Sequence, residues 1–179
     1  MAAKRTVVTV DDLDNALKSR DFARQWSTFE CYNKQRPSLD ALPVLRKALR
    51  NKNHAIVRSA AETLEKLGPA ALPAMPDLFQ AANRTDGRGR PQCYPDCLKA
   101  MVSIDPDNEG ILELITHWVG FHNWGIISNA MAALQLIGSV EAYSLLQRIH
   151  GFWFSHLSKA EKKIADRFLV ETQKKAKLK

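Results

Sequence analysis

The sequence is poor in cysteine and has no long apolar run. Its three cysteines are an odd number, and a helical chain of this length does not need disulfide bonds to fold. Cys93 and Cys97 lie four residues apart, yet no His or Cys pair lies nearby in the sequence to complete a zinc site. No apolar stretch approaches the length of about 20 residues that crosses a bilayer, and the run from Val7 to Val10 is too short for a secretory signal. We therefore expect a cytoplasmic protein that has no metal, no cofactor and no membrane association.

Catalytic and nucleotide-binding motifs are also absent from the sequence. It contains neither H-E-x-x-H nor G-x-S-x-G, which are typical of zinc proteases and serine hydrolases. These absences favour a non-enzymatic protein, although catalytic residues can also assemble from distant parts of a chain.

The segment from Arg84 to Arg90 concentrates three arginines around Gly87 and Gly89. We predict a flexible loop that is a solvated insertion, and the alternative is that it clasps an anionic group. It is not a nucleotide phosphate loop, because no strand precedes it and the Gly-Lys-Ser or Gly-Lys-Thr ending is missing.

A repeated helical pattern organises the rest of the chain, and its clearest copy is VRSAAETLEKLGP, from Val57 to Pro69. Apolar residues recur here at spacings of three and four, which places them on one stripe of a helix: Val57, Ala60, Ala61, Leu64 and Leu67. Gly68 can take the left-handed conformation that ends a helix, and Pro69 cannot continue one.

Two further copies follow at nearly constant distance. The first begins at Tyr94 and the second at Ile127, so the steps are 37 and 33 residues. A fixed period of this size indicates stacked helical units. We predict an all-α fold, a right-handed α-solenoid of about four to five helix pairs. Its expected parts are capping helices over 1–38, repeats over 39–69, 70–106, 107–139 and 140–172, and a basic tail over 173–179.

Local signals refine this prediction at both ends of the chain. Asp11 is expected to cap the first helix, and Ser158 with Glu161 predicts a capping box for the last. In the second capping helix, the apolar side is predicted to carry Phe22, Ala23, Trp26, Phe29 and either Cys31 or Tyr32.

The net charge of +7 is unevenly distributed. Residues 1–50 carry +4, residues 51–100 carry +2, and the last 29 residues carry +5, whereas residues 101–150 carry −4. An acidic third repeat between basic ends differs from the continuous basic stripe that is typical of a nucleic-acid groove.

Aromatic side chains gather at two predicted turns, one in repeat three and one in repeat four: Trp118, Phe121, His122 and Trp124, then Phe152, Trp153, Phe154 and His156. Repetition in register favours side chains that fill the seam between neighbouring repeats. The alternative is that Trp124 and Trp153 project outward and form a patch for a protein partner.

The helix pairs resemble HEAT repeats. The resemblance rests on a proline early in the first helix and on the V-R-x-A-A-x-x-L-x-x-L-G pattern of the second, both within LPVLRKALRNKNHAIVRSAAETLEKLGP at Leu42 to Pro69. It covers about Leu39 to Leu169, and repeat two departs from it by a longer loop and by Asp105 where Gly is usual. The resemblance implies a non-catalytic scaffold in which the second helices line the concave face.

The resemblance also implies where a partner would bind. The second-helix positions outside the apolar stripe form a ridge of charges and amides, and a solvated face is the alternative interpretation. With the added aromatic and loop arginines, the predicted partner-binding residues are Arg58, Glu62, Glu65, Asp96, Lys99, Ser128, Asn129, Gln135, Trp124, Arg88 and Arg90.

Two functional hypotheses remain. The first is a monomeric, non-enzymatic scaffold that binds a protein or peptide partner on its concave face, as an adaptor or an immunity-type protein. The second is a nucleic-acid-binding protein, similar to the HEAT-like alkylpurine DNA glycosylases. The acidic third repeat counts against the second hypothesis, because it places negative charge beside the aromatic residues that would have to approach a strand.

Overall fold

The computed structural model of the chain describes residues 7–121 and 123–177, and in them the fold is all-α. The chain divides into two compact units, which are unit 1 (Met1–Ile104) and unit 2 (Asp105–Lys179). Over the described residues, the closest approach to strand structure is one isolated bridge between Thr85 and Pro91. Within that same part of the chain, no helix is long and apolar enough to cross a membrane.

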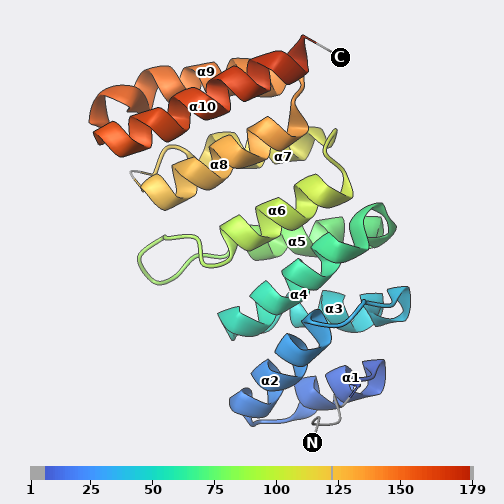
Figure 1. Cartoon of the computed structure of the whole chain (residues 1–179). Coiled ribbons are helices and arrows are strands. Elements are labelled where there is room, and N and C mark those ends of the chain that lie inside the picture. The colour runs from blue at the N-terminus through green and yellow to red at the C-terminus, as the bar shows by residue number, and fades with distance from the viewer. Residues whose placement is uncertain (1–6, 122, 178–179) are drawn as a thin grey trace, which may run out of the picture. The chain divides into compact units, whose positions relative to one another are not determined.

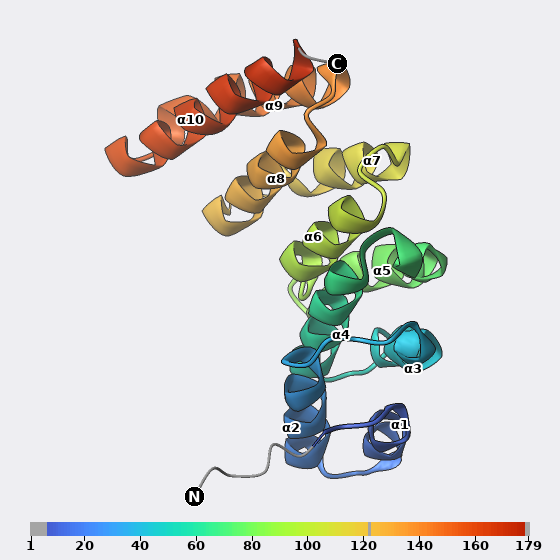
Figure 2. The same cartoon turned by 45° about the vertical axis from the view of Figure 1, so that its right-hand side comes forward.

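Unit 1 consists of helix pairs that follow one another along the chain (Figure 1). Its elements are α1 (Val10–Lys18), α2 (Phe22–Asn33), the 3-10 helix η1 (Leu39–Ala41), α3 (Leu42–Ala48), α4 (His54–Leu67), the 3-10 helix η2 (Gly68–Ala74), α5 (Met75–Ala82) and α6 (Tyr94–Ile104). Helix α1 packs on α2, α3 on α4 and α5 on α6, and α4 also packs on both α2 and α6 (Figure 2). The second helices of the pairs therefore form a row of three neighbours.

The apolar stripe that defines the repeat lies in the core of unit 1. Val57, Ala60, Ala61 and Leu64 are fully buried on α4, and Leu67 is half-buried. On α6 the matching residues Cys97, Leu98, Met101 and Ile104 are buried as well. Gly68 ends α4 with a positive φ of 57°, a conformation that Gly adopts without strain. The sequence prediction of these two helices is confirmed.

The caps of the first two helices show how side chains fix the helix starts. Thr9 caps α1 and forms a capping box with Asp12, so the prediction of Asp11 as the cap is wrong. The threonine hydroxyl accepts from the Asp12 amide while the Asp12 carboxylate accepts from the Thr9 amide, and this reciprocal pairing satisfies two otherwise free donors. Asp21 caps α2 and Asn53 caps α4 without a capping box, and the side chain of each accepts from the backbone amide two residues further on.

The buried residues of α2 differ in part from the predicted ones. Phe29 and Tyr32 are buried as expected, but Phe22 is 60% exposed and Trp26 is 49% exposed. Their place in the packed interface is taken by polar residues, because Gln25 donates to the Ser19 carbonyl at the end of α1 and Asn33 binds side chains of α4. The prediction that Phe22, Ala23 and Trp26 form the buried side is therefore wrong.

Unit 2 contains the elements α7 (Glu109–Trp118), α8 (Trp124–Ile137), α9 (Val140–Trp153), the 3-10 helix η3 (Phe154–His156) and α10 (Lys159–Ala176). Helix α8 packs on α7, α9 and α10, and α9 packs on α7 and α10. Ser158 and Glu161 form the predicted capping box at the start of α10, so that prediction is confirmed.

The aromatic residues of unit 2 separate into buried and exposed members. Trp118 and Trp153 are buried, Trp124 is half-buried, and Phe152 is 66% exposed. Trp153 therefore does not project outward, which was one of the two alternatives for the turns. His122 lies outside the described residues.

Gly138 ends α8 at a place where a side chain does not fit. Its φ is +62°, and a Cβ atom there would lie 3.0 Å from both Cβ and Cδ of Lys175 on α10. We expect Gly138→Ala to lower the free energy of unfolding by about 1–2 kcal/mol, the cost of a left-handed alanine, as measured by urea denaturation. Gly151→Ala is the matched control, because a Cβ there meets no atom within 4 Å and alanine favours the helix by about 0.5–1 kcal/mol. Similar effects of the two substitutions would contradict this account of Gly138.

Candidate partner-binding surface

The structure brings the predicted partner-binding residues of unit 1 together on α4 and α6. Arg58, Glu62 and Glu65 follow one another at spacings of four and three on α4, so they share one side of the helix. Asp96 and Lys99 lie on α6, which packs against α4. Arg58 and Lys99 are exposed, whereas both glutamates and Asp96 are half-buried.

Polar contacts link the C-terminal halves of the three second helices. From α2, the Asn33 amide donates to Glu62 at 2.5 Å and accepts from Lys66 at 2.8 Å. Towards α6, Glu65 pairs with Lys99 at 3.0 Å, and Ser103 donates to the Glu65 carbonyl oxygen at 3.0 Å. Glu62, Glu65 and Lys99 therefore hold neighbouring helices in register, which is a structural role that does not depend on a partner.

The N-terminal halves of the same helices carry exposed groups that sequence reasoning missed. Phe22, Trp26 and Asn33 are spaced by four and seven residues, so they lie on the same side of α2. Because Asn33 on that side contacts α4, Phe22 and Trp26 lie along the same edge, nearer the start of the helix. The N-caps Asp21 and Asn53 are 32 residues apart. When α2 and α4 are aligned with this offset, Phe22 takes the position equivalent to His54 and Trp26 the position equivalent to Arg58.

Arg58 in turn faces the start of α6. Burial raises the pKa of the Asp96 carboxyl, and the positive charge of Arg58 is the main opposing influence, which lowers it. We use the term aromatic–arginine face for the surface formed by Phe22, Trp26, His54, Arg58 and Asp96. It combines two exposed rings with one exposed guanidinium on three adjacent helices.

Cys93 lies behind this face in a cluster that resembles a reactive thiol site in composition only. Its Sγ is 3.7 Å from Nδ1 of His54, and the charges of Arg84 and Arg58 act on it. Burial nevertheless raises the pKa of the Cys93 thiol to about 11, so the nucleophilic thiolate is scarce at neutral pH. In the described part of the chain, no group of three or more His, Cys, Asp or Glu side chains could hold a metal ion.

The three cysteines differ in exposure, and this difference predicts the order in which they react with an alkylating reagent. Cys31 is exposed, whereas Cys93 and Cys97 are buried, and burial raises the pKa of both buried thiols. We expect iodoacetamide at pH 8 to alkylate Cys31 well before the other two, as followed by peptide mass spectrometry. In denaturant all three cysteines should react at similar rates. Fast native labelling of Cys93 would contradict its assignment as an inert core thiol.

The arginine loop, from Arg84 to Arg90, is a turn closed around the carboxylate of Asp86. The Asp86 carboxylate accepts from the backbone amides of Arg88 and Arg90 and pairs with the Arg90 guanidinium at 2.8 Å. These backbone hydrogen bonds are the main cause of the lowered pKa of Asp86. Arg88 is exposed.

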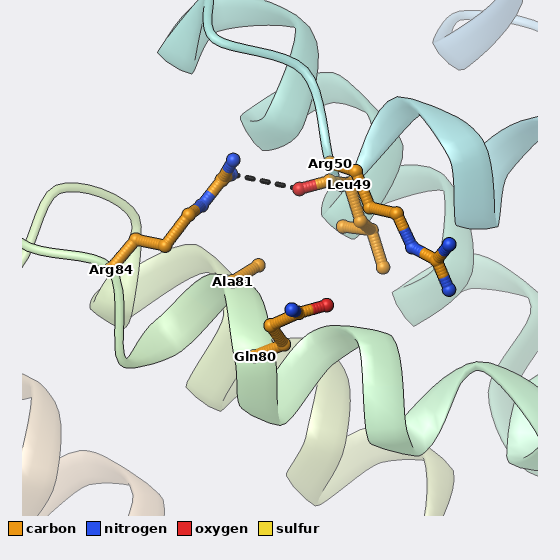
Figure 3. Close-up of a pocket in the computed structure, with 5 residues that line it drawn as sticks. All are labelled: Leu49, Arg50, Gln80, Ala81 and Arg84. Atoms are coloured by element: carbon orange, nitrogen blue, oxygen red, sulfur yellow. Dashed lines mark hydrogen bonds between the residues drawn. The ribbon is translucent and has the colours of Figure 1, made fainter.

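Arg84 caps the end of α3 and is not available as an anion clasp (Figure 3). Its guanidinium donates to the carbonyl oxygens of Leu49 and Asn51, both at 2.8 Å, where the negative end of the helix dipole favours a cation. A cavity of about 390 Å³ lies beside it, lined by Leu49, Arg50, Gln80, Ala81 and Arg84. The Arg50 and Arg84 head groups lie on opposite sides of this cavity in Figure 3, and Arg50 binds Asp77.

The predicted residues of unit 2 lie on α8, and most of them bind within that unit. Ser128 and Asn129 donate to the Gly125 carbonyl oxygen at 3.3 Å and 2.6 Å. Gln135 donates to Glu171 of α10. Trp124, at the first position of α8, is half-buried. The strongest combination of exposed aromatic and charged groups around the predicted ridge is therefore in unit 1.

Comparison with known proteins gives no family for the chain. No protein-family model matches it, and no curated protein sequence matches it either. The class that the fold defines is that of all-α proteins.

Proposed function

We propose that this chain is a non-enzymatic, HEAT-like helical scaffold that binds a peptide segment of a protein partner on its aromatic–arginine face. The observation that carries the proposal is the exposure of Phe22 and Trp26 on α2 and of Arg58 on α4, the helix against which α2 packs.

The order of helix packing supports the scaffold part of the proposal. In unit 1 each first helix packs on the second helix that follows it, and α4 lies between α2 and α6. This is the neighbour pattern expected of stacked repeats, in which each unit contacts those before and after it. The residues that repeat in the sequence are those buried between the helices, which fits one structural unit used several times.

The chemistry of the exposed residues supports the binding part. An exposed Trp or Phe leaves apolar area in water, and covering that area is favourable by roughly 25 cal/mol per Å². Trp and Arg are also the residues that most often dominate the energy of protein interfaces. Polar contacts of Asn33, Glu62, Glu65 and Lys99 hold the C-terminal halves of the same three helices in register, so little ordering entropy is lost when a partner binds.

A nucleic acid is the other class of partner, and salt dependence separates the two. Each phosphate contact to a basic side chain contributes about −0.9 to the slope of log affinity against log salt concentration. A peptide anchored by Phe22 and Trp26 should show a much shallower slope, because apolar burial is insensitive to moderate salt.

The proposal is tested by selecting from a random peptide library displayed on phage, using the full chain as the target. The double variant Trp26→Ala, Arg58→Ala serves as the counter-target, and binding of a random-sequence DNA duplex is measured in parallel. We expect peptides that bind the wild type and are lost on the double variant, with a shallow salt slope. Recovery of no such peptide, together with steep salt-dependent binding of the duplex, would replace the proposal with nucleic-acid binding.

A further inference from the structure

Unit 2 contains a second candidate site, which lies between the end of α7 and the second half of α9. A cavity of about 290 Å³ opens there, lined by Thr116, Val119, Gly120, Leu145, Arg148, Ile149, Phe152 and Trp153. None of these residues belongs to the aromatic–arginine face, so the inference below does not depend on the proposed function.

The lining of this cavity is apolar over most of its surface. Leu145, Ile149 and Trp153 are buried and form its wall on α9, while Phe152 stands 66% exposed beside it. The Thr116 hydroxyl donates to the Leu112 carbonyl oxygen of its own helix at 2.8 Å. The cavity therefore offers mainly dispersion contacts and burial to whatever occupies it.

Arg148 is the exception in this lining. It is the only Lys or Arg among positions 101–150, which hold five Asp and Glu residues. Its guanidinium is exposed, and no carboxylate among the described residues pairs with it. An exposed guanidinium beside an apolar wall is complementary to a carboxylate that is attached to an apolar group, since a carboxylate can accept two parallel hydrogen bonds from it.

The size of the cavity restricts the occupant. Pockets for small molecules and cofactors span about 300–1,000 Å³, and this one lies at the lower end of that range. It has room for an aromatic or branched aliphatic side chain.

We propose that this cavity binds an acidic peptide segment of a partner, in which one large apolar side chain enters between Val119 and Ile149 and the next residue's carboxylate pairs with Arg148. Phe152 then covers the inserted side chain from the solvent side. The arrangement selects an apolar residue followed by Asp or Glu.

The test uses acetyl-Gly-Phe-Glu-Gly-amide, titrated into the isotope-labelled full chain and followed by the backbone amide signals of the protein. Its counterpart with Gln in place of Glu measures the contribution of the carboxylate. We expect saturable shifts centred on Val119, Gly120 and Phe152, and binding weaker by about tenfold or more for the Gln peptide, the usual effect of losing a charge-assisted hydrogen bond.

The variant Arg148→Gln should lose the same factor, whereas the matched variant Arg167→Gln, which removes an exposed arginine of α10, should bind like the wild type. Both variants should unfold at the wild-type temperature, because both arginines are exposed. Equal binding of the Glu and Gln peptides, equal loss in both variants, absence of saturable shifts, or shifts centred on α2 and α4 would each overturn the proposal.

Discussion

Replacing Asp77 with alanine is expected to lower the free energy of unfolding by about 3 kcal/mol. Asp77 lies in the first turn of α5 and is buried, and it accepts from Arg46 Nε at 2.6 Å and from Arg50 at 2.7 Å and 3.0 Å. Removing one member of a buried ion pair usually costs about 3–5 kcal/mol. The lower end applies here because both arginines are partly exposed and regain water when the carboxylate is gone.

The measurement is urea denaturation followed by circular dichroism, with Asp14→Ala as the control. Asp14 also pairs with two cations, Lys18 and Lys47, but these contacts lie at the surface, where ion pairs contribute little. A loss of stability for Asp77→Ala no larger than that for Asp14→Ala would contradict the assignment of Asp77 as the link between α3 and α5.

The contribution of Asp77 should also depend on pH. Burial raises the pKa of its carboxyl, but the hydrogen bonds and charges of Arg46 and Arg50 outweigh burial, so the net pKa is lowered. A carboxyl with a lower pKa in the folded state stabilises the fold above its unfolded pKa of about 3.9, and this stabilisation is lost as the pH falls through the folded value. The difference between wild type and Asp77→Asn should therefore be constant near neutral pH and shrink in acid.

Replacing Trp26 with alanine is expected to weaken peptide binding by about thirtyfold, the effect of about 2 kcal/mol at an interface anchor. Because the ring is 49% exposed, the same substitution should change the unfolding temperature only slightly. The measurement is isothermal titration calorimetry with a peptide selected as described above.

Phe121→Ala is the matched control for this prediction. It also removes an exposed aromatic ring, but from unit 2, so it should leave the affinity unchanged. If Trp26→Ala binds like the wild type, or if both substitutions weaken binding equally, Trp26 is not the anchor.

The parts of the fold that the sequence predicts are those set by contacts within one helix. Val57, Ala60, Ala61 and Leu64 recur with the helical period, and helical periodicity alone places them on one buried side. Gly68 ends its helix through its own backbone freedom, which is also a local property. These predictions hold because they need no knowledge of which helices become neighbours.

The residues of α2 that are buried could not be read in this way. Apolar periodicity predicted that Phe22 and Trp26 are buried. Gln25 and Asn33 are buried instead, because each forms a hydrogen bond with a residue outside α2. The Asn33 partners Glu62 and Lys66 are 29 and 33 residues away. Such pairings depend on tertiary contacts, so a polar residue that is satisfied in the core looks like a surface residue in the sequence.

The sequence predicted only part of the aromatic–arginine face, because the rest of it also depends on which helices become neighbours. Arg58 and Asp96 were identified from their positions outside the apolar stripe, whereas Trp26 and His54 were missed. The N-caps Asp21 and Asn53 are a signal that could have found them, since aligning α2 and α4 by their caps gives Trp26 the position equivalent to that of Arg58. The pairing of Arg46 and Arg50 with a buried Asp77 had a weaker signal, two arginines four residues apart on one helix side.

The measurement that most directly tests the central claim is a chemical-shift map of a selected peptide bound to the isotope-labelled full chain at low and high salt. The account predicts that the largest shifts fall on Phe22, Trp26, His54, Arg58 and Asp96, and that they persist at high salt. Shifts confined to other parts of the chain, or binding that vanishes at high salt, would contradict the proposal that the aromatic–arginine face binds a peptide.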